Sequence, residues 1–354
     1  MTSGCRCLCA VVCLAFVGCS GGEQDAVIAQ FKGNEVSLAP TDSLALSDLG
    51  IYVPTDVEHV DSVLIISSGQ AKNAVDLLCG DKIIHCFNVG RGPGEILMAS
   101  NFQLVGDRLY QYDIKNMRLW ALDIGRTIMS GRQQADIACE YNGMSEDINR
   151  LNRPFKVRVL PDGGVVASGI FVNDCWYGIL GADGVISSPI PYVMTEGLED
   201  FSDKQLAAVH TSNSLAVSPS GKKVASALLG ISAISMSEYS GGNLKENYRF
   251  VGAEPEVSAP GNKNMPALIW SPDSKMGFCD LDCDDENVYA LYSGRRRGDE
   301  FPASECSWIL VMDWEGNPIR AYSLSRTLCA FCLDGDRIFG VSSYPEAKLY
   351  VFNI

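Results

Sequence analysis

One short pattern recurs along this chain and restricts its fold more than any other feature: an apolar strand, a tight turn with Gly or Asp, and a second apolar strand. Six such turns stand near residues 61, 106, 163, 221, 274 and 335, which are 45, 57, 58, 53 and 61 residues apart. Turns such as Pro161-Asp162-Gly163 supply the backbone angles that β-hairpins need. The flanking residues are largely β-branched or aromatic. The chain is therefore built from repeated β-hairpin units.

A second hairpin follows in several units, for example over residues 115–123 and 308–317. Two hairpins make a four-stranded sheet, and six such sheets at this spacing are typical of a β-propeller. A sheet that is apolar on both faces is stable when neighbouring sheets cover it, as they do in a ring. Two packed sheets, the alternative, would give shorter and less regular spacing. We predict an all-β fold, a six-bladed β-propeller with four antiparallel strands per blade.

The last unit offers only three strands, over residues 328–333, 338–343 and 348–354. Without a fourth strand the final blade would keep an open edge. The N-terminal stretch 27–38, with the strand Glu35–Leu38, is expected to close that blade, so residues 27–354 are predicted to form one domain. Residues 39–58 would then cross back to blade one.

The N-terminus has the composition of an export signal. Arg6 is the only charged residue before Glu23, and the apolar run from Leu8 to Val17 is too short to span a membrane. A plain signal peptide, or a cytosolic N-terminus rich in cysteine, would share these features.

The apolar run ends in Phe16-Val17-Gly18-Cys19, which resembles the lipobox of bacterial lipoproteins, with Phe16 where Leu is usual. The resemblance implies a lipoprotein signal peptide over residues 1–18, lipidation of Cys19 and a flexible tether over residues 19–26. Several acyl chains on one cysteine anchor a protein firmly to a membrane. The acidic residues that follow Cys19 resemble surface-export signals. We therefore expect a lipid-anchored protein of the bacterial cell envelope, at the outer membrane, facing the periplasm or the cell surface.

Charge excludes some partners. The chain has 28 Lys and Arg against 43 Asp and Glu, a formal net charge of -15. Nucleic acids and anionic membrane surfaces both attract basic faces, so neither is an expected electrostatic partner. The composition, 47% hydrophobic and 20% charged, is that of a chain that buries a sizeable core.

Five of the 14 cysteines lie within residues 1–19, and nine remain in the body of the chain: Cys79, Cys86, Cys139, Cys175, Cys279, Cys283, Cys306, Cys329 and Cys332. Most stand among apolar strand residues, which favours buried thiols. One or two disulfides are also compatible with export, and an odd number leaves at least one thiol unpaired within the chain. A four-thiolate zinc site is disfavoured, because Cys329 and Cys332 would point to opposite faces of a strand.

Three motifs resemble a known family. Ser271-Pro272-Asp273-Ser274-Lys275 and Ser218-Pro219-Ser220-Gly221-Lys222 resemble the Ser-Pro-Asp-Gly-Lys turn of TolB-like propeller repeats. Gly90-Arg91-Gly92-Pro93-Gly94-Glu95 resembles the Gly-x-Gly-Pro-Gly-Glu signature of TolB-like six-bladed propeller lipoproteins. The resemblance covers roughly residues 55–354. It implies a fold and a location, and it implies no particular chemistry.

Known catalytic and ligand motifs are missing from the sequence. The segment Gly90–Glu95 lacks the Lys-Ser/Thr of a phosphate loop, and Pro93 removes an amide donor. The acidic run Asp280–Asn287 lacks the Gly and Glu that a calcium loop requires at its sixth and twelfth positions, and we predict a solvated turn there, before a strand over residues 288–292. The chain has three histidines, without a nucleophile elbow or a His-Glu-x-x-His helix. We therefore predict no catalytic residue, no bound metal and no cofactor.

Candidate ligand contacts come from irregular segments, because propeller blades form the scaffold and loops carry recognition. The three glycines and the proline of Gly90–Glu95 favour a tight connection between blades; in the alternative, Arg91 and Glu95 line the channel mouth and contact a ligand. The longer segments 136–153, 193–211, 252–266 and 294–305 carry the other candidates, Arg153, His210 and Arg295. We predict that a ligand touches these insertions and not the short hairpin turns.

Two functional hypotheses remain open. The first is a non-catalytic envelope protein that binds a glycan, a peptide or another envelope protein. The alternative is an envelope hydrolase or lyase with its active site at the channel mouth. Clustered His, Arg and carboxylate groups with shifted pKa values would favour the enzyme, whereas an uncharged aromatic groove would favour the binding protein.

Overall fold

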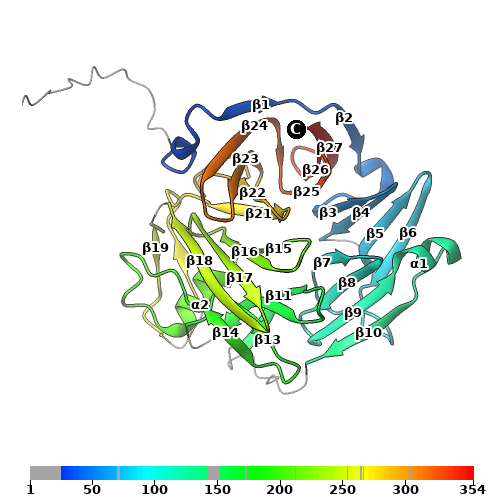
Figure 1. The fold of residues 1–354 in the computed structure, drawn as a ribbon, viewed down its shortest axis with the longest axis horizontal. Coiled ribbons are helices and arrows are strands. Elements are labelled where there is room, and N and C mark those ends of the chain that lie inside the picture. The colour runs from blue at the N-terminus through cyan, green and yellow to red at the C-terminus, as the bar shows by residue number, and fades with distance from the viewer. Residues whose placement is uncertain are drawn as a thin grey trace, which may run out of the picture.

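The computed structural model describes residues 25–354, apart from 70–71, 142–151, 172–173, 212, 253, 264, 266 and 303. Six sheets, each with four antiparallel strands, stand around a central axis (Figure 1). The predicted six-bladed β-propeller is confirmed. The signal peptide, Cys19 and the start of the tether lie outside the described residues.

Each of the first four blades follows the chain in order. Blade one contains β3 (Pro54–Val60), β4 (Val63–Ser68), β5 (Asn73–Cys79) and β6 (Lys82–Asn88). Blade two contains β7 (Ala99–Val105), β8 (Arg108–Asp113), β9 (Arg118–Asp123) and β10 (Ala135–Glu140). Blade three contains β11 (Asn152–Val159), β12 (Val165–Phe171), β13 (Tyr177–Leu180) and β14 (Ile186–Ile190). Blade four contains β15 (Asn213–Val217), β16 (Lys223–Leu228), β17 (Ala233–Ser240) and β18 (Asn243–Val251).

The last two blades also take strands from the N-terminus. Blade five contains β21 (Phe278–Cys283), β22 (Asn287–Tyr292), β23 (Cys306–Asp313) and β24 (Pro318–Leu328). Blade six contains β25 (Ala330–Asp334), β26 (Arg337–Ser342), β27 (Lys348–Asn353) and the N-terminal strand β2 (Asp42–Ala45). In every blade the first strand is the innermost, next to the first strands of the neighbouring blades.

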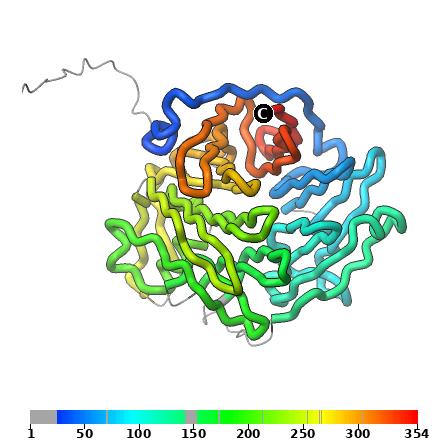
Figure 2. Tube along the Cα trace, viewed as in Figure 1, coloured from blue at the N-terminus to red at the C-terminus, as the bar shows by residue number. Residues whose placement is uncertain are grey.

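Closure by an N-terminal strand is confirmed, but the closing residues differ from the prediction. β2 pairs antiparallel with β27 and completes blade six. The expected strand, β1 (Glu35–Leu38), instead pairs parallel with β24 as a fifth strand of blade five. The N-terminal segment thus runs along the outer rim across both blades, as the blue trace in Figure 2 shows. Both β24 and β27 can pair with this segment, because each is an outer edge strand whose backbone N–H and C=O groups would otherwise be unpaired.

The first hairpin of blade five is not the predicted one. Ser271–Lys275 lies before β21, where Lys275 forms an isolated bridge with Arg296. The true turn joins β21 to β22, and the Asp284 side chain accepts hydrogen bonds there from the backbone N–H of Glu286 and Asn287. The predicted acidic turn thus begins only at Asp284, because residues 280–283 belong to β21, and it takes the place that the repeat assigned to Ser274.

The remaining elements are short. They are the 3-10 helices η1 (Ile28–Phe31) and η2 (Ser47–Leu49), the α-helices α1 (Ile124–Ser130) and α2 (Asp203–Thr211), and the strand pair β19 (Val257–Ser258) and β20 (Ile269–Trp270). Within the described part of the chain, neither α-helix is long and apolar enough to cross a bilayer.

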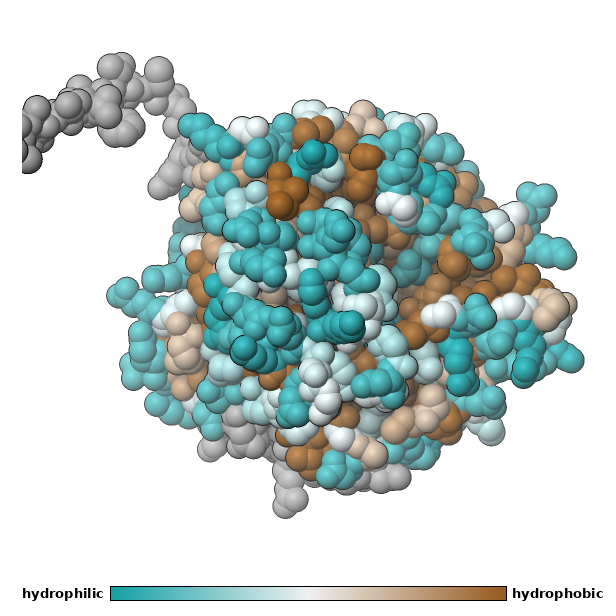
Figure 3. All heavy atoms as spheres, in the orientation of Figure 1, coloured by the Kyte–Doolittle hydropathy of each residue, from teal (hydrophilic) through white to brown (hydrophobic). Residues whose placement is uncertain are grey.

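Six apolar clusters hold the ring together, one between each pair of neighbouring blades. Trp176, for example, is fully buried between blades three and four, and Tyr292 between blades four and five. Burial of both faces of every sheet removes a large apolar area from water, which is the main stabilising contribution. On the face drawn in Figure 3, hydrophilic side chains cover the centre of the ring.

Candidate functional site

The inner strands surround the axis. Each of them is the edge strand of its sheet, so one side of it has no strand partner in the described sheets. Backbone N–H and C=O groups on such an edge need other hydrogen-bonding partners. Blade five supplies two such hydrogen-bonding partners to the inner strand of blade six. Asp280 Oδ2 accepts a hydrogen bond from the Phe331 N–H at 3.1 Å, and Asp282 Oδ2 accepts one from the Leu333 N–H at 2.7 Å. These carboxylates therefore tie two blades together.

Every other joint between blades has a similar side-chain bond. The contacts are Asn101 Nδ2 to Asp56 Oδ2 at 3.0 Å, Gln103 Nε2 to the Val159 carbonyl at 3.1 Å, Arg158 Nε to the Leu215 carbonyl at 2.9 Å, Ser214 Oγ to the Cys279 carbonyl at 2.9 Å, and His59 Nδ1 to Asp334 Oδ2 at 2.8 Å. The inner strands thus form a ring that polar side chains close from blade to blade.

A cavity of about 540 Å³ lies on the axis inside this ring. Its charged lining consists of Asp56, Glu58, Arg158, Asp280, Asp282 and Asp284. Turn residues also line it, among them Gly106, Pro161, Pro219 and Gly335. The cavity therefore reaches the end of the ring where the first hairpins turn.

The acidic groups of the cavity bind protons more tightly than free side chains do. Burial raises the pKa of Asp280 to about 7, with the Asp56 carboxylate as the next contribution, and raises the pKa of Asp282 to about 6. Burial also raises the pKa of Glu58 well above its ordinary value, and the charges of Asp282 and Asp56 add to that shift. Desolvation disfavours the charged form of each carboxyl group.

Two ionisable side chains near the axis lack an ion-pair partner. Among the described residues, neither the Glu58 carboxyl nor the Lys156 ammonium makes a close ion pair, and the Glu58 carboxyl has the backbone N–H of its neighbour His59 as its hydrogen-bond partner. Burial lowers the pKa of Lys156, which interacts electrostatically with Asp280 and Asp56. Glu58 lines the cavity. Its other acceptor positions are therefore available to a ligand.

A family model matches residues 34–336 of the chain, from the strand β1 to the last inner hairpin; it describes TolB-like 6-blade propeller-like proteins. The chain belongs to this family. The two TolB-like turn motifs and the Gly-x-Gly-Pro-Gly-Glu segment are thus correct indicators of its relatives. No curated protein sequence matches this TolB-like propeller.

Solved structures share the fold of this TolB-like propeller at low sequence identity. A member of the DUF4221 family from Bacteroides vulgatus has a TM-score of 0.56 and 11% identity, over 91% of this chain and 99% of that chain. Regucalcin, a calcium-binding protein from Agrobacterium tumefaciens, has a TM-score of 0.50 and 10% identity, over 90% of this chain and 96% of that chain. At such identity the likeness concerns the fold. In the described part of this propeller, no group of three or more His, Cys, Asp or Glu side chains is arranged to hold a metal ion.

The candidate residues Arg91 and Glu95 lie in the connection between β6 and β7 of this propeller. Glu95 Oε2 accepts a hydrogen bond from the Gly92 N–H at 2.5 Å. A Cβ atom on Gly90 would stand 2.1 Å from the same oxygen, so a larger residue there would displace the Glu95 carboxylate. The Glu95 carboxylate therefore stabilises a tight connection between blades, and Arg91 is exposed beside it.

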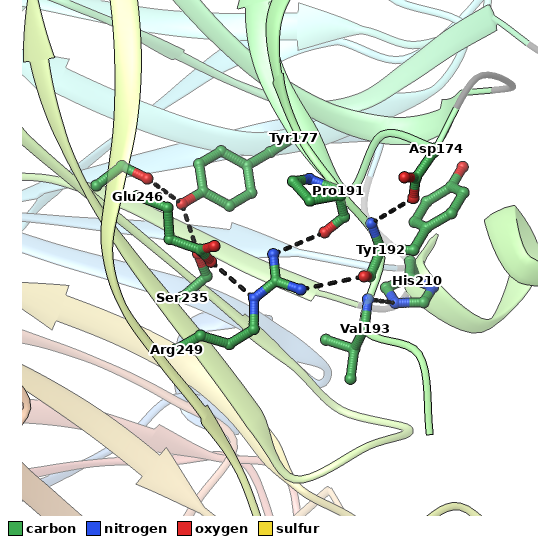
Figure 4. A network of polar contacts seen from close by, with 10 residues as sticks. Asp174, Tyr177, Pro191, Tyr192, Val193, His210, Ser235, Glu246 and Arg249 are labelled. Carbon is green, nitrogen blue, oxygen red and sulfur yellow. Dashed lines mark hydrogen bonds and ion pairs between the residues drawn. The ribbon is translucent and has the colours of Figure 1, made fainter. Parts of the chain in front are cut away.

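His210 is placed differently from the expectation of an exposed loop residue. It is fully buried in α2, where its Nε2 accepts from the Val193 N–H at 2.9 Å and its Nδ1 bonds the Leu206 carbonyl at 2.8 Å (Figure 4). Burial lowers its pKa to about 4, so the imidazole is neutral. Both ring nitrogens are engaged within the protein, and His210 is therefore not presented to a ligand in this structure.

The remaining candidates also stay outside the cavity lining. Arg295 stacks on Phe301, with its guanidinium carbon 4.4 Å from the ring centroid. Arg153 is half-buried near the start of β11, and most of the insertion before it lies outside the described residues. The structure therefore does not bring the five predicted residues together.

The cavity residues themselves were not among the sequence candidates. A signal for them exists, because three inner strands carry charged residues two positions apart: Asp56 and Glu58, Lys156 and Arg158, Asp280 and Asp282. Residues two apart on a strand share a face, and paired charges inside an apolar strand are unusual. The sequence interpretation assigned Asp280 and Asp282 to an acidic turn, which begins only after them.

Proposed function

We propose that this propeller is a lipid-anchored binding protein of the bacterial cell envelope, attached through Cys19, that acts without catalysis. Its ligand enters the axial cavity from the face of the first hairpin turns. The occupant is a small polar unit that donates hydrogen bonds, such as a sugar residue of a glycan or a side chain of a peptide. The observation that carries this proposal is the Glu58 carboxyl, which lines the cavity and, within the described protein, is bonded to the backbone N–H of its neighbour His59, so that its other acceptor positions are available to a ligand.

The size and chemistry of the cavity support this function. Sites for small molecules typically measure about 300–1,000 Å³ and contain a few convergent polar groups, and this cavity of about 540 Å³ lies within that range. Carboxylates accept hydrogen bonds from hydroxyl and ammonium groups, and the Arg158 guanidinium can donate to hydroxyl oxygens. Tyr289 and Phe331 add apolar surface to the lining. The cavity therefore suits a polar ligand with an apolar face.

One observation favours the alternative, a hydrolase or lyase. The pKa of Asp280, raised to about 7, is near the value that a general acid needs at neutral pH. Asp282, however, has both carboxyl oxygens bonded to backbone N–H groups, of Leu333 and Cys283. Asp280 also has one oxygen so bonded. The raised pKa values follow from burial, and the backbone hydrogen bonds of these groups act against them. Because both carboxyl groups join blades, we assign them a structural role and prefer the binding protein.

The test is a thermal-shift screen of wild-type protein with envelope saccharides and short peptides, followed by calorimetry of each hit on Glu58→Gln. The control is Glu254→Gln, the same change at an exposed carboxyl outside the cavity lining. We expect Glu58→Gln to weaken binding about tenfold, the effect of one lost hydrogen bond, and Glu254→Gln to bind as wild type. Equal affinity in all three proteins would place the site elsewhere. Release of a cleaved product would favour the enzyme.

A further inference from the structure

Two cysteines of blade five are in unusually close contact. The Sγ atoms of Cys279 and Cys306 lie 2.8 Å apart. Nonbonded heavy atoms pack best at about 3.5–4.0 Å, whereas the bond of a disulfide is about 2.05 Å long. The two sulfur atoms are therefore closer than packing alone favours, in a chain whose nine described cysteines are all thiols.

The topology of blade five explains how residues from two non-adjacent strands meet. β22 separates β21 from β23 and ends at Tyr292, which pairs with Phe278 on one side and Trp308 on the other. Cys279 is the extra residue of a bulge in β21 directly after Phe278. Cys306 is the first residue of β23 and comes two residues before Trp308 in the chain. Since β22 stops at this end of the sheet, the two thiols approach each other without a strand between them.

The surroundings of the pair decide which thiol reacts first. Cys306 is fully buried and Cys279 is half-buried, so an external reagent reaches Cys279 before Cys306. A third thiol, Cys329, is close enough to interact electrostatically with Cys306, but its sulfur donates to the Pro54 carbonyl at 3.4 Å. This bond holds Cys329 toward blade one and away from the pair.

We propose that Cys279 and Cys306 form a disulfide when the protein meets an oxidant that itself carries a disulfide. The Cys279 thiolate attacks one sulfur of the oxidant, forms a mixed disulfide and releases one thiol. The Cys306 sulfur then attacks Cys279 Sγ, breaks the mixed disulfide and transfers its proton to the second departing thiolate. The pair loses two electrons and two protons, and the oxidant's disulfide becomes two thiols.

The product would form a covalent ring from residue 279 to residue 306. This ring contains β22 and the insertion that carries Arg295 and Phe301. A crosslink over a loop of this length restricts the unfolded chain and thereby stabilises the folded state. Because Cys279 directly precedes Asp280, the bond would also fix the bulge next to the axial cavity.

The experiment uses reduced wild-type protein, oxidised glutathione, alkylation of the remaining thiols and peptide mapping by mass spectrometry without reduction. We expect one linked peptide pair, joining residues 279 and 306 and lighter by two hydrogen atoms, and a melting temperature about 5 °C higher than that of the reduced protein. Cys175→Ser, which removes a buried thiol of blade three, is the matched control and should behave as wild type.

Cys306→Ser should lose both the linked peptide and the thermal shift. If that variant fails to fold, the peptide map of the wild-type protein decides alone. A map in which both cysteines are alkylated after oxidation, or in which Cys279 is joined to Cys329, would overturn the proposal.

Discussion

Asp282 on the inner strand of blade five accepts a 2.7 Å hydrogen bond from the backbone N–H of Leu333 on the inner strand of blade six. This contact replaces a strand–strand hydrogen bond across a joint that no sheet spans. The same carboxyl group lines the axial cavity. Residues that close the ring and residues that line the cavity are therefore partly the same, which links the stability of this propeller to the protonation of its channel.

The first prediction concerns the pH dependence of stability. The folded-state pKa of Asp280, about 7, is higher than its unfolded value of about 3.9. The folded protein therefore binds more protons than the unfolded chain between about pH 4 and pH 7. The contribution of Asp280 to stability is fully present below pH 4 and is lost as the pH rises through 7.

Denaturant titrations at pH 5 and pH 8 measure this effect. The wild-type protein should lose unfolding free energy between pH 5 and pH 8, because folded Asp280 releases its proton in that range. Each unit of pKa shift corresponds to about 1.4 kcal/mol, so this loss should be smaller in Asp280→Asn by about 1.4 kcal/mol or more. Asp200→Asn, at an exposed aspartate, is the control. An identical loss in Asp280→Asn and in the wild type would show that Asp280 does not titrate as its surroundings indicate.

The second prediction concerns His210. Replacement with Ala leaves the Val193 N–H and the Leu206 carbonyl without their partner inside the protein. Each buried unsatisfied group costs about 1–3 kcal/mol, so the variant should lower the free energy of unfolding by at least 2 kcal/mol. Chemical denaturation checks this value, and His85→Ala, where the side chain is mostly exposed, is the control. A loss below 0.5 kcal/mol would contradict the structural role.

The pH effect of His210 has the opposite sign to that of Asp280. Its folded pKa, about 4, is below the ordinary value of 6.5. The stability it contributes is therefore present above pH 6.5 and is lost as the pH falls through 4. His210→Ala should remove this acid-side loss, which a second denaturant titration at pH 4.5 measures.

The third prediction concerns the contribution of the two N-terminal strands, β1 and β2, to stability. Deletion through residue 34 keeps both strands, and deletion through residue 45 removes both and opens the outer edges of blades five and six. We expect the longer deletion to destabilise the protein by several kcal/mol more than the shorter one, because blade six loses its fourth strand and the apolar contacts behind it. Thermal unfolding of both truncations tests this, and equal melting temperatures would refute closure by β2.

The fourth prediction concerns the anchor. Cys19→Ala should abolish incorporation of a labelled fatty acid and release the protein from the membrane fraction, whereas Cys13→Ala, within the signal peptide, should remain labelled. The physical reason is that the thioether requires the Cys19 thiol and that several acyl chains are needed for stable anchoring. Labelling of Cys19→Ala to the wild-type level would exclude a lipobox at this position.

The sequence by itself determined the number of blades and their pattern of four antiparallel strands. Hairpin chemistry and apolar alternation are local properties, so the turns at Gly106 and Gly335 could be placed from neighbouring residues alone. Regular spacing then implied the ring. The same local reasoning misplaced the first hairpin of blade five, because Ser271–Lys275 and the run after Asp284 both have the composition of a turn, and only strand pairing distinguishes them.

Tertiary structure alone decided where the chemistry lies. His210 and Glu58 are both polar residues in mixed surroundings, but folding buries His210 with both nitrogens bonded and leaves Glu58 facing the axial cavity. Likewise, β1 and β2 are similar short strands, and only the geometry of the two outer edges assigns one to each blade. These outcomes depend on contacts between residues distant in the chain, whereas blade number and turn chemistry depend on contacts between neighbours.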